Sequence, residues 1–234
     1  METYRWIVFV HVGAGIVALA TFWIAAVLRK GSPRHRRVGQ SYLLAMLGVI
    51  ASGVPLSMAM VEHGRPAAAM FLGFLLLITA TGCINAWRAI RVRGDRRRYF
   101  GALFWILALL NAIAGVGIIV LGVASGSVLF QVFGGVGVFV LVDSVLRWRK
   151  APKDALWWLR EHYGAMIGNG VATHIAFFSI GLRNALPGVD PAIVQHFAWF
   201  APLVVAFVAA TWLGRRYGRR APAAPPRTID APSA

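Results

Sequence analysis

Acidic residues and cysteines are scarce in this chain. Only 8 aspartates and glutamates stand against 24 lysines and arginines in 234 residues, and the single cysteine is Cys83. One cysteine excludes an intramolecular disulfide and a cysteine-based metal cluster. The net charge of +16 would suggest nucleic-acid binding in a soluble chain. Here the charge lies in short loops between apolar stretches, where attraction to anionic lipid explains it. We therefore expect the lipid bilayer as partner, and no nucleic acid.

Long polar segments are missing as well, because seven apolar stretches fill most of the chain. Each is close to the ~20 residues that cross the hydrocarbon layer. They lack the alternation of a barrel strand, so we expect an all-α integral membrane protein with seven transmembrane helices. These helices form one domain, residues 1–220, followed by a disordered cytoplasmic tail, residues 221–234. The predicted spans are residues 6–28, 40–60, 67–86, 100–123, 128–146, 164–182 and 192–213.

The basic residues alternate from loop to loop and so predict an orientation. All but Arg5, Arg65 and Arg183 lie in alternate loops or in the tail. Basic loops stay in the cytoplasm, so the N-terminus is predicted outside and the C-terminus inside. The arginine-rich loops are residues 29–39, 87–99 and 147–163.

Six histidines supply the candidate site residues, because ionisable groups within or beside membrane spans usually serve a site. They divide into two layers. His35 and His162 lie next to the predicted inner ends of their spans, and His174 lies nearer the midplane. The outer group consists of His11, His63 and His196.

Two of the histidines lie on one predicted helix. His162, Met166, Gly170 and His174 recur every four residues, so they form one inclined stripe. The two histidines are about 18 Å apart along the axis, too far apart to share one ion. Paired histidines on one helix resemble the arrangement in membrane b-type cytochromes. Haem b would then bind neutral imidazoles, with Gly170 leaving room for the flat macrocycle.

The partners in such haem sites must come from other helices. His35 could oppose His162 on the inner side, and His11 or His196 could oppose His174 on the outer side. The resulting hypothesis is a redox or electron-transfer protein.

A second hypothesis gathers the outer histidines around one ion. His11, His174, His196 and His63 could hold zinc or copper near the outer leaflet. Three nitrogen ligands with an open position are the catalytic pattern for zinc, which would make the protein a metal-dependent membrane hydrolase. The sequence leaves open whether the protein is an enzyme.

A third hypothesis needs no cofactor. Imidazoles can simply hydrogen-bond across helices, and Asn111 and Asn169 could line the path of a small-molecule transporter. Asp143 is the one carboxylate clearly within a predicted span. We expect it to pair with Arg147 one turn later, with a proton relay to His162 as the alternative.

Two histidine motifs resemble an uncharacterised bacterial family of predicted multi-span membrane proteins. The first is the run His35-Arg36-Arg37-Val38-Gly39, with His11 in the preceding span. The second is Glu161-His162-Tyr163-Gly164-Ala165-Met166, followed by Ala172-Thr173-His174. The resemblance implies a multi-pass protein of the bacterial inner membrane, with one functional set that consists of His11, His35, His162, Met166 and His174. It implies no particular activity.

Overall fold

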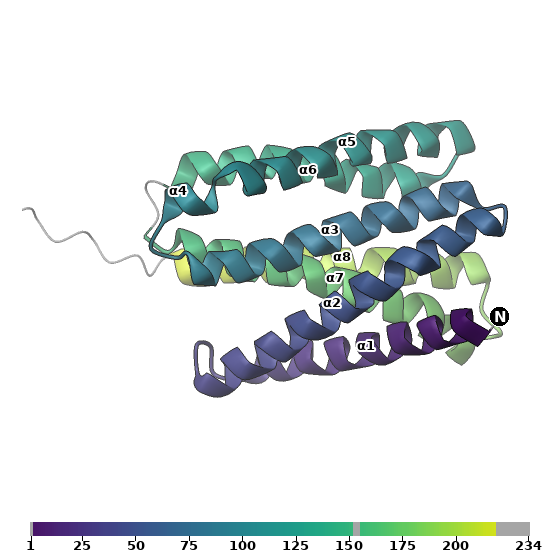
Figure 1. Cartoon of the computed structure of the whole chain (residues 1–234), viewed down its shortest axis with the longest axis horizontal. Helices are drawn as coiled ribbons and strands as arrows, with labels where there is room; N and C mark the ends of the chain where they lie inside the picture. The colour runs from purple at the N-terminus through teal and green to yellow at the C-terminus, as the bar shows by residue number, and fades with distance from the viewer. Residues whose placement is uncertain (1, 152–154, 219–234) are drawn as a thin grey trace, which may run out of the picture.

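A computed structural model of the chain describes residues 2–151 and 155–218, and every regular element in this part is an α-helix (Figure 1). The tail predicted for residues 221–234 lies outside the described residues. The helices are α1 (Glu2–Val27), α2 (Pro33–Glu62), α3 (Pro66–Arg91), α4 (Arg96–Tyr99), α5 (Ala102–Ser125), α6 (Val128–Lys150), α7 (Trp157–Ala185) and α8 (Pro191–Gly218).

Six helical segments are long and apolar enough to cross a membrane, judged by length and composition. They are α1, α2, α3, the α4–α5 segment, α6 and α8. The multi-pass helical membrane class predicted from the sequence is therefore confirmed. The seventh long helix, α7, is not among these six segments of the described residues, and it carries Glu161, His162, Asn169 and His174.

Local sequence explains where several helices begin. Ser32 caps α2 by accepting a hydrogen bond from the backbone N–H of His35, at 3.1 Å. Gly126 adopts a left-handed conformation at the end of α5, and Ser127 then caps α6. Asp190 accepts a hydrogen bond from the N–H of Ala192 at the predicted start of α8.

One helix was not predicted. The four-residue helix α4 lies in the predicted arginine-rich loop 87–99, and the predicted span 100–123 corresponds to the single helix α5. Asp95 caps α4 through the N–H of Arg98, and extended backbone at Gly101 separates it from α5. The short helix places three arginines at the end of the bundle rather than inside it.

The helices run lengthwise side by side, with α5 and α6 forming a hairpin above α3, α7 and α8, and with α1 and α2 below (Figure 1). Helix α3 packs against α2, α5 and α7, while α7 also packs against α1 and α8. The α1–α2 loop and α4 lie at the same end, opposite the N-terminus. We call this end the arginine-rich end.

Aromatic side chains fill the largest core, where α3, α5, α6 and α7 meet. Phe71 stacks on Phe130 at 4.7 Å between ring centroids, and Phe133 meets Trp199 of α8 edge-on at 5.2 Å. A second core joins α1 and α2 through Ala18, Tyr42 and Met46. These two cores hold α7 between the hairpin and the α1–α2 pair.

Candidate functional site

His35 lies in the first turn of α2, where its ring meets the end of α1. Its Nδ1 is 3.1 Å from the carbonyl oxygen of Ala25. That carbonyl belongs to the last turn of α1, whose carbonyls have no partner within the helix. The ammonium of Lys30 donates to the carbonyls of Ala25 and Ala26, at 2.9 and 2.6 Å. The imidazole and the ammonium therefore cap α1 together.

His162 lies in the second turn of α7. Its Nδ1 is 3.1 Å from the carbonyl oxygen of Ala86 on α3, and Ala86 is fully buried. Burial lowers the pKa of His162 below its ordinary value of 6.5. The Ala86 carbonyl raises that pKa, and the charges of His35 and Lys30 lower it further. His162 is thus a neutral imidazole with His35 in its electrostatic surroundings.

The two rings share one tautomer. A carbonyl oxygen can only accept a hydrogen bond, so Nδ1 carries the proton in both His35 and His162 and Nε2 keeps its lone pair. Nowhere in residues 2–151 and 155–218 does a side chain or backbone group hydrogen-bond to either Nε2 atom. Metal-ligating histidines typically have this arrangement, with one nitrogen anchored and the other open.

His174 is arranged differently. Its Nδ1 donates to the carbonyl of Gly170 at 2.6 Å, and its Nε2 accepts from the indole N–H of Trp23 at 3.0 Å. The rings of Phe22 and Phe178 flank it at 5.6 and 5.9 Å between centroids. Both imidazole nitrogens are occupied, so His174 has no lone pair to offer to a metal in this arrangement.

Gly170 leaves no room for a macrocycle, contrary to the expectation from the stripe. A Cβ at this position would lie 2.5 Å from Cζ of Phe22. Met166 packs against the core of Ala18, Tyr42 and Met46. The stripe on α7 therefore presents its middle residues to α1 and α2, and only His162 keeps an open nitrogen.

The remaining histidines are held separately from one another. His11 donates through Nδ1 to Ser52 at 3.0 Å, because the Ser52 hydroxyl is itself directed to the Gly48 carbonyl. His63 and His196 are exposed, and each bonds a carbonyl one turn back in its own helix. Among the described residues, no three His, Cys, Asp or Glu side chains could hold a metal ion together. The outer zinc or copper site thus gains no geometric support.

A buried charge cluster lies beside His162, and the sequence predicted only one of its contacts. Arg147 of α6 pairs with Asp143 at 2.7 Å, as expected, and also with Glu161 of α7. The hydroxyl of Tyr99 donates to Glu161 at 2.9 Å. Burial raises the pKa of Glu161, and the opposing effects of Arg147 and Tyr99 only partly offset it. Since Asp143 bonds Arg147, the relay from Asp143 to His162 has no contact to support it.

The two asparagines join helices in the interior. Asn111 is fully buried and donates to Thr81 of α3 at 2.7 Å. Asn169 lies against α3 so closely that a side chain on Gly82 would collide with it. These contacts hold α5 and α7 on α3, while the buried Oδ1 of Asn111 has no hydrogen-bond partner among the described residues.

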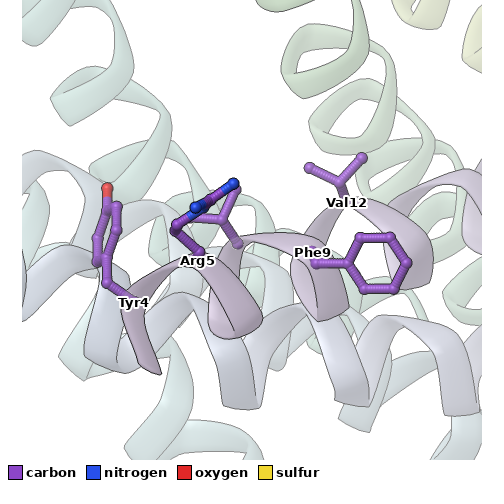
Figure 2. A pocket seen from close by; sticks show the side chains of 5 residues that line it. Tyr4, Arg5, Phe9 and Val12 are labelled. Atoms are coloured by element: carbon purple, nitrogen blue, oxygen red, sulfur yellow. The ribbon is translucent and has the colours of Figure 1, made fainter. Parts of the chain in front are cut away.

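A shallow hollow of about 400 Å³ lies along the first turns of α1. Figure 2 shows its lining side chains on successive turns of that helix, with Arg5 as the charged one. The others are Tyr4, Val8, Phe9 and Val12. No histidine lines the described part of this hollow, so it adds nothing to the candidate site.

No family model, curated protein or solved structure matches this chain. The resemblance of its two histidine motifs to an uncharacterised bacterial family therefore stays a prediction. The function has to be inferred from the geometry alone.

Proposed function

We propose that this protein is a seven-span protein of the bacterial inner membrane, with its N-terminus outside and its arginine-rich end in the cytoplasm. Two arginine-rich elements, the α1–α2 loop and α4, lie at one end of the bundle (Figure 1), which supports this orientation. Helix α7 is the seventh span, and its polar residues are accommodated by packing against α1, α3 and α8.

Reporter fusions test the topology. An alkaline phosphatase placed after Gly126 should be active, because it would lie outside, and one placed after Gly94 should be inactive. A fluorescent protein at the C-terminus should fluoresce, because it folds in the cytoplasm. The reverse pattern would overturn the orientation, and activity on both sides of α7 with the same reporter would exclude α7 as a span.

We further propose that the His35–His162 pair binds the iron of a b-type haem and that the protein transfers electrons. One observation carries this proposal: both imidazoles are anchored through Nδ1 to a backbone carbonyl, and both have Nε2 open. Haem iron takes neutral imidazole, and the lowered pKa of His162 favours that form. The bound haem would supply one-electron chemistry.

The number of available ligands favours haem over zinc. A zinc site takes three or four protein ligands, and no such group gathers within the described residues. A haem supplies four equatorial nitrogens itself and needs one or two side chains from the protein. The carbonyls of Ala25 and Ala86 would hold the two rings in orientation, and Lys30 would leave a positive charge beside them.

The test is a reduced-minus-oxidised visible spectrum of the purified full chain from haem-supplied cells, with haem quantified in the same sample. H35A and H162A should each lose the sharp reduced bands. H174A is the matched control and should keep them, because His174 is already hydrogen-bonded at both nitrogens. Thermal unfolding of each variant separates loss of haem from loss of fold.

Two outcomes would overturn the haem proposal. Haem-free protein from haem-replete cells would favour the cofactor-free transporter. Haem that survives H35A and H162A but is lost in H174A would move the site to the outer layer.

A further inference from the structure

Four arginines form an exposed patch at the arginine-rich end, and the candidate haem site does not use them. Arg91 ends α3, Arg93 lies in the following turn, and Arg97 and Arg98 belong to α4. All four are exposed. We call them the α3–α4 arginine patch.

Aromatic rings fix two members of the patch in position. The Arg91 guanidinium carbon lies 5.4 Å from the ring centroid of Trp87, and that of Arg93 lies 5.9 Å from the ring of Trp158 on α7. A guanidinium held face-on against a ring keeps its N–H edge available for an anion. The patch is therefore more ordered than a set of freely solvated side chains.

No ion pair among the described residues involves an arginine of the patch. Both salt bridges found within residues 2–151 and 155–218 belong to Arg147. Asp95, the acid nearest in sequence, uses its side-chain oxygen to accept the Arg98 N–H and cap α4. Four positive charges thus face outward without a carboxylate partner in the described part of the chain.

The position of the patch identifies its anionic partner as a lipid. Arg91 is the last residue of an apolar helix long enough to span a membrane. Trp87, one turn earlier, is 42% exposed, as expected for an aromatic ring at the membrane interface. We propose that the α3–α4 arginine patch binds the phosphate of an anionic phospholipid headgroup.

The α1–α2 loop together with the first turns of α2 provides a matched control, because this segment has as many exposed arginines at the same end of the bundle. There the polar groups of Lys30 and Arg36 are used on backbone carbonyls, which they reach at 2.6–3.1 Å. No aromatic contact to its arginines is found among the described residues. The control segment therefore carries a similar charge, but no guanidinium in its described residues is held against an aromatic ring.

The experiment titrates the delipidated full chain in mild detergent with phosphatidylglycerol, and with phosphatidylcholine as the uncharged reference. Native mass spectrometry counts the bound lipids. The patch variant R91Q/R93Q/R97Q/R98Q is compared with R29Q/R34Q/R36Q/R37Q, which removes the same charge from the control segment. Circular dichroism and a C-terminal reporter establish that both variants are folded and correctly oriented.

Each arginine near an anionic surface contributes about fivefold to affinity, so loss of four arginines should weaken phosphatidylglycerol binding by up to about 600-fold. The control variant should lose less than about tenfold, and phosphatidylcholine binding should not change. Equal losses in both variants would overturn the proposal, because net charge alone would then explain the binding. Unchanged binding in the patch variant would overturn it too, as would displacement of the lipid by inorganic phosphate at equal concentration.

Discussion

Replacing Glu161 by alanine should destabilise the bundle much more than replacing Asp143, although both carboxylates pair with the same guanidinium. The Glu161 side chain is 3% exposed and that of Asp143 is 37% exposed. Removing one partner of a buried ion pair costs about 3–5 kcal/mol when the other charge stays buried without compensation. Because Arg147 is 32% exposed and keeps Asp143, the expected loss is smaller, about 2–3 kcal/mol, and includes the buried Tyr99 hydroxyl left without an acceptor. An exposed pair contributes about 0–1 kcal/mol.

The structure specifies why the two losses differ. In E161A the Nε of Arg147 keeps its bond to Asp143, but its Nη1 loses the Glu161 carboxylate. The buried hydroxyl of Tyr99 also loses its acceptor. In D143A both of these contacts survive. E161Q keeps a side-chain oxygen for Tyr99 while removing the charge, so its cost should lie between those of the two alanine variants.

The assay is reversible unfolding in mixed micelles of dodecyl maltoside and dodecyl sulfate, followed by circular dichroism. We expect a loss of about 2–3 kcal/mol for E161A and at most about 1 kcal/mol for D143A. Equal losses would refute the reasoning, because the buried carboxylate would then have no special role. A larger loss for D143A would mean that the pair within α6, rather than the link to α7, organises Arg147.

Further predictions concern helix packing, protonation and the outer histidine. G115A should cost about 1–3 kcal/mol in the same unfolding assay, because its Cβ would lie 2.5 Å from a backbone carbonyl of α6. G117A, with open space around it, should be neutral or slightly stabilising. Because burial holds the pKa of His162 below 6.5, the folded bundle binds fewer protons than the unfolded chain. The stability that the buried neutral His162 contributes should be complete above pH 6.5 and be lost as the pH falls below that value. H162Q should flatten this part of the plot of stability against pH. W23F removes the indole hydrogen bond to His174, so it should cost about 1 kcal/mol and leave any haem spectrum unchanged.

The helices could be predicted because membrane spans are encoded locally. Apolar length, caps such as Ser127 and Asp190, and the alternation of arginines all act within a few residues of the element they define. Helix α4 was not predicted, because its residues lie in the arginine-rich loop 87–99. It depends on the cap at Asp95, and the extended backbone at Gly101 separates it from α5.

The charge cluster was only half predictable. Asp143 and Arg147 are one helical turn apart, so spacing alone indicated their pairing. Glu161 precedes the predicted span 164–182 and lies in the predicted loop 147–163. In the structure α7 begins at Trp157, seven residues before that span, and this continuation carries Glu161 into the interior. The information that buries it resides in α4 and α6, far away in the sequence.

The spacing of the histidines predicts which of them share a helix face, but it does not predict which imidazole nitrogens are hydrogen-bonded. His162 and His174 lie three helical repeats apart on α7, so the sequence treats them as equivalent. On the neighbouring helices, however, His162 faces a fully buried alanine, whose small side chain lets its carbonyl approach the ring. His174 lies against Trp23, and the indole N–H of Trp23 donates a hydrogen bond to its Nε2. Backbone carbonyls have the same chemistry in every residue, so no sequence motif reveals which imidazole nitrogen they engage. The neighbouring residue at each level therefore decides which histidine can serve as a ligand, and this is why we assign the proposed site to His35 and His162.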